Sequence, residues 1–173
     1  MFLNRFLNDR RGSPAVEFAF IAPVVIMLYF GMVEATQALL VERRTGYIAT
    51  AVGDLATQSA QLRESDIDDI FKISATVMRP FPTDELGIRL TSVKFDNNGV
   101  ASVVWTRKNQ ADIPDMDLGS IDQKLRIPNT ALVRAETLYS YKTPFQKMLP
   151  GLFVFKHKMD LRPRSGVAIP LLS

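Results

Sequence analysis

The residue with the clearest chemical potential is Glu17, which stands where a short basic leader meets a long apolar segment. The leader ends at Gly12, and the sixteen residues Phe18–Val33 that follow Glu17 carry no charge. A carboxylate costs about 2.5–3.5 kcal/mol at the centre of a membrane helix, so its position calls for an explanation. Two interpretations are open. Glu17 is either an ionic partner for a positive group in an apolar setting, or an interfacial residue whose carboxylate reaches back to water.

Residue types that support enzyme chemistry are sparse. The chain has no cysteine and one histidine, with no G-x-S-x-G elbow and no glycine-rich phosphate loop. Glu17 and Glu34 lie about 25 Å apart along a helix, too far to share a proton. We therefore expect no enzyme activity, no cofactor and no metal site. The net charge of +3 is dispersed, without a basic stripe, which argues against nucleic-acid binding.

The apolar segment is long enough to cross a membrane. It continues past Val33 with few polar residues, whereas a secretory signal has an apolar region of about 7–15 residues and a small-residue cleavage site. Three arginines against one aspartate in the leader favour a cytoplasmic N-terminus, although Arg43 and Arg44 weaken that bias. Pro23 should kink rather than end the helix, because lipid leaves the backbone few alternatives. We expect a membrane helix over residues 13–41 and a separate domain over residues 42–173.

The helix should continue beyond the membrane as a stalk, because apolar residues recur at alternating four- and three-residue steps: Ile48, Val52, Leu55, Ser59 and Leu62. A second helix should start at Ser65 with Asp68 in a capping box, and Pro80 and Pro82 should stop it. Its buried face is predicted to hold Ile67, Ile70, Phe71, Ser74, Val77 and Met78. The aspartates at its start fit a helix N-terminus better than a calcium loop.

Beyond Leu86 the pattern changes to the two-residue alternation of strands. Residues 88–95 and 100–106 predict a hairpin around Asp96-Asn97-Asn98-Gly99, with a bulge near Thr91-Ser92. Residues 108–129 have weak patterning and predict an irregular surface connection.

Two later strands should each have one covered and one wet face. The covered face is predicted to hold Val133, Ala135, Thr137, Tyr139, Tyr141, Phe153, Phe155, His157, Met159 and Leu161. The wet face is predicted to hold Arg134, Glu136, Lys142, Lys156, Lys158, Asp160 and Arg162. His157 is thus expected to be a buried core group. The fold class is α+β, with a long N-terminal helix packing on a small antiparallel sheet and a second short helix.

The start of the chain resembles the TadE-like proteins, the minor pseudopilins of tight-adherence (Tad, type IVc) pili. The resemblance rests on Arg11-Gly12, on Val16-Glu17-Phe18-Ala19, on Pro23 and on Gly31-Met32-Val33-Glu34. It covers roughly residues 10–50. The first residue after Gly12 is serine rather than the phenylalanine of type IVa pilins, which favours the Tad branch.

The resemblance implies a processed, pilin-like protein. A prepilin peptidase would remove residues 1–12 by cutting between Gly12 and Ser13, and Glu17 and Phe18 would serve recognition and assembly. The implied partners are that peptidase, other minor pilins, the major pilin, the inner-membrane assembly platform and membrane lipid. The implied location is the bacterial inner membrane, single-pass, with a cytoplasmic N-terminus and a periplasmic domain, and incorporation into the pilus is open. The implied function is initiation of the pilus or a place at its tip, for adherence to surfaces. The alternative is an unprocessed single-pass membrane protein whose periplasmic domain binds or scaffolds a partner.

Overall fold

The computed structural model describes residues 13–110, 113–143 and 152–172. The chain divides into two compact units, Met1–Ala38 and Leu39–Ser173. Two helices and a four-stranded antiparallel sheet make the fold α+β, as predicted. The elements in chain order are α2 (Ser13–Gln58), β1 (Leu62–Arg63), α3 (Glu64–Thr76), β2 (Leu86–Phe95), β3 (Ala101–Lys108), η2 (Leu118–Ser120), η3 (Gln123–Leu125), β4 (Ala131–Lys142), β5 (Leu152–Leu161) and β6 (Leu171–Leu172).

In the first unit every described residue belongs to α2. Pro14 follows the first helical residue, where a missing backbone N–H costs nothing because the first turn has no intrahelical partners. Pro23 also lies inside α2 and does not end it, which confirms the expectation from the sequence. One backbone hydrogen bond is lost there, and the surrounding apolar residues still favour a helix.

In the second unit the sheet has the strand order β3-β2-β4-β5, and all neighbours are antiparallel. The predicted hairpin is confirmed: β2 and β3 are joined by a turn in which Gly99 has φ of 75°. Asp96 shapes this turn, because its Oδ1 accepts hydrogen bonds from the backbone N–H groups of Asn98 and Val100, both at 2.8 Å. The register shifts between Ser92 and Val93, next to the predicted bulge.

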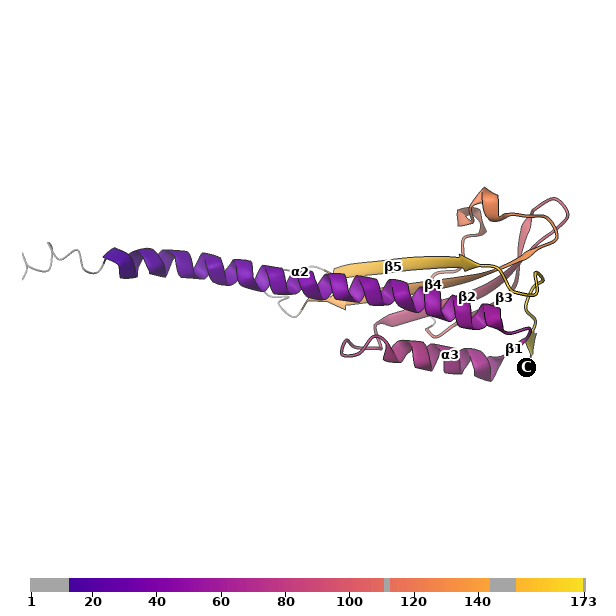
Figure 1. Ribbon diagram of the computed structural model, residues 1–173, viewed down its shortest axis with the longest axis horizontal. Helices are drawn as coiled ribbons and strands as arrows, with labels where there is room; N and C mark the ends of the chain where they lie inside the picture. Colours follow the sequence, from indigo (N-terminus) through magenta and orange to yellow (C-terminus); the bar gives the residue numbers. More distant parts are fainter. Residues whose placement is uncertain (1–12, 111–112, 144–151, 173) are drawn as a thin grey trace, which may run out of the picture. The chain divides into compact units, whose positions relative to one another are not determined.

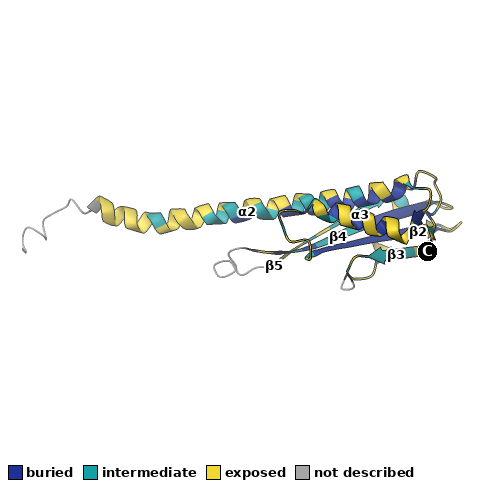
Figure 2. Ribbon diagram, turned by 90° about the horizontal axis from the view of Figure 1, so that it is seen from below, coloured by how far each residue is buried: buried dark blue, intermediate teal, exposed yellow. Residues whose placement is uncertain are grey.

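One face of the sheet, here called the helix-side face, packs on the part of α2 that belongs to the second unit (Figure 1). The Thr137 hydroxyl donates to the Thr45 carbonyl at 3.0 Å. A Cβ added at Gly53 would lie 2.7 Å from Cδ1 of Leu161 and 3.4 Å from Cβ of Ala135, so glycine allows the close approach. Ile48 and Val52 are fully buried, whereas Leu55 is 40% exposed and departs from the predicted stripe. Figure 2 shows buried residues concentrated on the strands and on parts of both helices.

Helix α3 is tied to α2 within the second unit by Arg44. Its Nη1 donates to the carbonyl of Val77 at 3.0 Å and to the carbonyl of Arg79, and its guanidinium lies 5.6 Å from the centre of the Phe81 ring. Arg44 thus satisfies carbonyls at the C-terminal end of α3, where a cation is favoured. Ile67, Phe71, Ser74 and Met78 are buried as predicted, and Ile70 and Val77 are half-buried.

The predicted start of α3 was wrong by two residues. Arg63 rather than Ser65 is the residue that caps the helix, which begins at Glu64, and the carboxylate of Asp66 accepts the backbone N–H of Arg63 at 2.9 Å. An acid at the third helical position can reach back to the residue before the helix, so Asp66 takes the role assigned to Asp68.

A short parallel pairing joins distant parts of the second unit. Strand β6 pairs with β1, and the backbone N–H of Leu62 donates to the carbonyl of Pro170 at 3.1 Å. The indole N–H of Trp105 donates to the carbonyl of Ile169 at 2.7 Å. Neither contact was predicted from the sequence.

The opposite face of the sheet, here called the outer face, is only in part the wet face that the alternation predicted: Lys142, Lys156, Lys158 and Arg162 are exposed, but Glu136 and Asp160 are half-buried. Arg134 is fully buried, and the connection between β3 and β4 packs over that part of the sheet. Ile121 of the connection joins a buried cluster with Val93, Phe95 and Leu132. Alternation assigns residues to a face but does not reveal what covers the face, so charged residues were expected in water.

His157 is also placed differently from the prediction. It lies on the helix-side face, where a Cβ added at Gly46 would be 3.3 Å from its Nδ1. Its side chain is half-buried rather than buried, because β5 is an edge strand and leaves one side of the ring uncovered.

Replacing Tyr139 with phenylalanine is expected to lower stability by about 1 kcal/mol, because the hydroxyl donates to the Pro82 carbonyl at 3.0 Å. Burial, helped by the charges of Glu85 and Asp84, raises the pKa of Tyr139 to about 12. An unfolded tyrosine has a pKa of about 10, so this stabilisation is complete below pH 10 and is lost as the pH rises towards 12.

Denaturant unfolding of the two proteins in detergent, at pH 8 and at pH 11.5, measures this difference. The variant should lose less stability than the wild type over that interval. Tyr47→Phe is the control, because Tyr47 is 63% exposed and should behave as wild type. Equal pH dependence of stability in the wild type and in Tyr139→Phe would contradict the raised pKa of Tyr139.

Candidate processing and assembly segment

The start of α2 carries the residues that the sequence analysis singled out. Ser13 is the first residue of α2, whereas Gly12 and the rest of the predicted leader lie outside the described residues. Glu17 and Phe18 follow within the first turns, and both side chains are exposed, Phe18 to 71%. The structure therefore places three of the four candidate residues on one regular helix.

Helix geometry fixes how these residues relate. Ser13 and Glu17 are four residues apart, which is about 6 Å along the axis and on the same side of the helix. Phe18 lies about 100° further round. A positive group at the Ser13 backbone nitrogen would thus share a helix side with the Glu17 carboxylate, and the two would be offered together to a neighbouring helix.

The residues that follow Glu17 on α2 are apolar on every side of the helix as far as Val33. A helix that is apolar all round requires lipid or other helices to cover it. In the described part of the chain, α2 is long and apolar enough to span a membrane, with a mean hydropathy of 2.1 over its most apolar stretch. The large exposed side chains in the first unit are Val16, Phe18, Phe20, Ile21, Val24, Val25, Ile26, Met27, Leu28, Tyr29 and Met32.

The described residues offer no group of three or more His, Cys, Asp and Glu side chains placed to hold a metal ion. Glu34 lies on α2 three residues after Gly31, and no role is assigned to it. Among the described residues of this segment, the Glu17 carboxylate is a group that can form an ion pair in an apolar environment.

Comparison with protein families shows which known proteins the start of α2 is similar to. The family model described as TadE-like protein matches residues 12–53. This segment is similar to TadE-like proteins. The match begins at Gly12, so it contains Gly12, Ser13, Glu17 and Phe18, and it ends within α2. The resemblance inferred from the sequence is confirmed over that range.

The TadE-like match stops before α3, so the sheet and its outer face lie outside it. Comparison of the chain with curated proteins and with solved structures gave no match. The roles of the four candidate residues thus rest on the TadE-like segment and on helix geometry, and they remain predictions. The sequence analysis missed that charged residues of the outer face are buried. The available signal was charge complementarity between strands, because Arg134 and Glu136 lie opposite Asp160 and Lys158.

Proposed function

We propose that the protein is a minor pseudopilin that takes part in assembling a Tad-type pilus. The observation that carries this proposal is the TadE-like segment, which begins at Gly12 and contains Glu17 at the edge of a long apolar helix. A pilus-associated protein needs a helix that is stable in lipid and can also pack with other helices. The exposed apolar surface of α2 in the first unit meets both needs.

In this proposal a prepilin peptidase cuts between Gly12 and Ser13. The cut leaves an ammonium group on Ser13 beside an apolar helix. Burying an unpaired charge costs several kcal/mol, so the Glu17 carboxylate of a neighbouring subunit stabilises that ammonium when the subunits associate. A subunit in the wrong register would leave both charges unpaired, which gives the pair a role in setting register. Phe18 adds an exposed aromatic side chain to the same contact surface.

The protein works without catalysis of its own. It sits in the inner membrane as a single-pass protein, with its N-terminus in the cytoplasm and residues 42–173 in the periplasm. Its partners are the peptidase, other minor pilins, the major pilin and the membrane assembly platform. It initiates the pilus or stays at its tip, where the periplasmic domain contributes to adherence.

The test is the N-terminus of the protein recovered from cells that do or do not make the prepilin peptidase. With the peptidase, N-terminal sequencing should read Ser13-Pro14-Ala15, and the intact mass should fall by the mass of residues 1–12. Without it, the full chain should remain. Gly12→Asp should also leave the full chain, because the cleavage site accommodates a residue with no side chain.

Full-length protein as the only species in piliated cells would contradict the proposal. That outcome would favour the alternative, an unprocessed single-pass membrane protein with a scaffolding domain. Gly12→Asp protein that is cut as efficiently as wild type would move the cleavage site away from Gly12.

A further inference from the structure

The end of the second unit at which α2 enters it, here called the apolar end, carries exposed apolar side chains from two elements. Leu39 and Leu40 of α2 are 54% and 41% exposed, and Phe153 and Val154 at the start of β5 are 51% and 44% exposed. Adjacent residues of a strand point to opposite faces, so β5 presents apolar side chains on both faces of the sheet here. Exposed apolar side chains that gather in one place mark a contact surface for a membrane or another protein.

The register between α2 and β5 places these side chains at one level of the second unit. Both elements run in the same direction, because Gly46 lies against His157 and Gly53 lies against Leu161 (Figure 1). Phe153 is four residues before His157, which is about 13 Å along a strand. The helix enters the unit seven residues before Gly46, which is about 10 Å along a helix. The exposed residues of α2 and β5 therefore lie at the same end of the unit.

This end continues directly from the segment that is long and apolar enough to span a membrane. Residues 13–41 of α2 are about 43 Å long, which matches the thickness of a bilayer with its headgroups, about 40–45 Å. In the single-pass location proposed above, Leu39 and Leu40 thus lie in the headgroup layer, and the charged residues 42–44 follow at its edge. Because one helix joins the two, the apolar end is held at the bilayer surface.

The charges around the apolar end also fit a lipid surface. Its acids are covered or engaged, because Glu42 is half-buried and Glu85 pairs with Lys142. Arg43 on α2 and Lys156 on β5 are exposed, and neither has an ion-pair partner in the described part of the chain. Basic side chains beside an apolar patch are stabilised by lipid phosphates, whereas a purely apolar partner would leave them unpaired.

We propose that the apolar end of the second unit rests on the surface of a lipid bilayer. Phe153 and Val154 enter the boundary between headgroups and acyl chains, and Arg43 and Lys156 lie at the level of the phosphates. This contact gives the domain a fixed orientation towards the membrane. The inference rests on the single-pass location proposed above, and it does not depend on cleavage before Ser13.

The test uses the absence of cysteine from the chain, because a single introduced cysteine can be labelled at a chosen position. Full-length Phe153→Cys and Val154→Cys proteins, each carrying a nitrobenzoxadiazole fluorophore, are placed in vesicles of phosphatidylethanolamine and phosphatidylglycerol. Lipids with a nitroxide near the headgroup end of the acyl chain should quench both labels at least about threefold more strongly than a label at Val103. The Val154 label keeps the test decisive if the change at Phe153 lowers stability.

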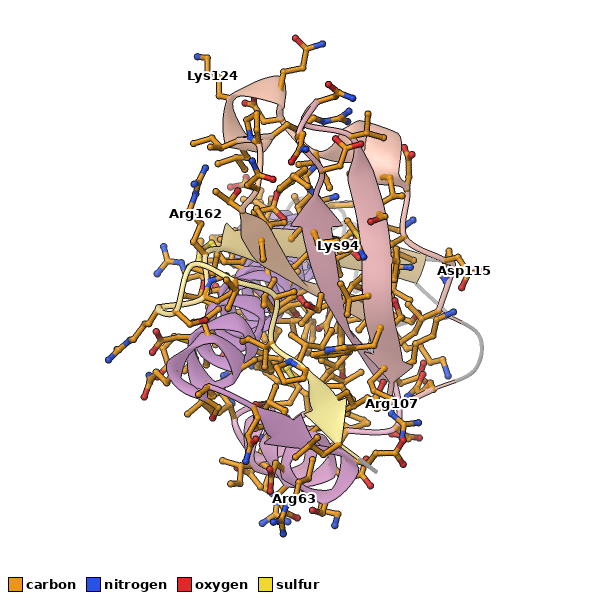
Figure 3. The ribbon with its side chains drawn as sticks, turned by 90° about the vertical axis from the view of Figure 1, so that its right-hand side faces the viewer. Arg63, Lys94, Arg107, Asp115, Lys124 and Arg162 are labelled. Atoms are coloured by element: carbon orange, nitrogen blue, oxygen red, sulfur yellow. The ribbon has the colours of Figure 1, made fainter. Side chains whose placement is uncertain are left out.

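Val103→Cys is the matched control, because Val103 is also 44% exposed and lies at the opposite end of the sheet. Its neighbours across the strands are Val93 and Leu132, in a row that lies beyond the last residue pair of β4 and β5. Figure 3 looks onto this opposite end, where Lys94 and Arg162 are labelled. Equal quenching at Val103 and at the start of β5 would overturn the inference, since lipid contact would not be confined to the apolar end.

Leu28→Cys separates this inference from the proposed location, because Leu28 lies in the uncharged run of α2 and is 68% exposed. A label there should be quenched by nitroxides placed deep in the acyl chains. Quenching at Leu28 without quenching at Phe153 and Val154 would overturn the inference and leave the location standing. No quenching at Leu28 would overturn both.

Discussion

Replacing Glu17 with alanine is expected to reduce pilus assembly at least about tenfold while leaving membrane insertion and cleavage after Gly12 intact. Removing a carboxylate from an apolar helix favours insertion. In the assembled state, however, the ammonium of a neighbouring Ser13 would be buried without a partner, at a cost of several kcal/mol. Glu17→Gln should behave like the alanine variant, because it keeps the size of the side chain and removes its charge.

The measurements are pilus number by electron microscopy and the amount of the protein in sheared pili. Asp54→Ala is the control, since Asp54 is an exposed acid on the same helix, whose carboxylate accepts a hydrogen bond from the Gln58 side chain at 2.7 Å. Unchanged pilus number and incorporation in Glu17→Ala would mean that no ammonium depends on this carboxylate. The interfacial interpretation of Glu17 would then stand.

Replacing Asp160 with alanine is expected to lower the stability of the protein by about 3–5 kcal/mol. Arg134 is fully buried, and its Nε and Nη2 donate to the two oxygens of Asp160 at 2.5 and 2.6 Å. Its Nη1 also donates to the Ser120 hydroxyl at 2.5 Å. Without Asp160 a buried guanidinium remains with no counter-charge, which costs far more than the pair itself contributes.

Denaturant unfolding in detergent measures this loss. Asp69→Ala is the control, because Asp69 and Lys72 form an exposed pair that should be worth about 0–1 kcal/mol. The double variant Arg134→Met, Asp160→Leu should recover much of the stability, since it removes both charges and fills the same space. A loss below 1 kcal/mol in Asp160→Ala would contradict the view that Asp160 neutralises a desolvated charge.

Local pattern was sufficient to predict the helix of the first unit and the resemblance of its start to TadE-like proteins, whereas the roles of the candidate site residues stay predictions. The uncharged run after Glu17 predicts a continuous helix because a membrane environment leaves no competing structure, and Pro23 does not interrupt it. The resemblance to TadE-like proteins could also be found from the sequence, since the matching segment, residues 12–53, is one continuous stretch of chain. Nothing in this part depends on a distant contact.

Local pattern also placed residues on the correct faces of the sheet. The alternation along β4 and β5 put Thr137 and His157 on one face, and the register pairs them directly. What it could not give was the extent to which each face is covered. Burial of Arg134 depends on a connection with little periodicity of its own, and the partial exposure of His157 depends on β5 lying at the edge.

The pairing of β6 with β1 has a consequence for when the second unit can form. Strand β1 lies at the beginning of this unit and β6 near its end, so their contact closes a loop that spans almost the whole domain. Such a contact contributes only after the intervening chain is available, and its entropic cost is met late in folding. If the second unit is exported to the periplasm as proposed, the segment that contains Leu62 would cross the membrane long before Leu171. Strand β1 would therefore stay unpaired, and the domain incomplete, until residue 172 has crossed the membrane.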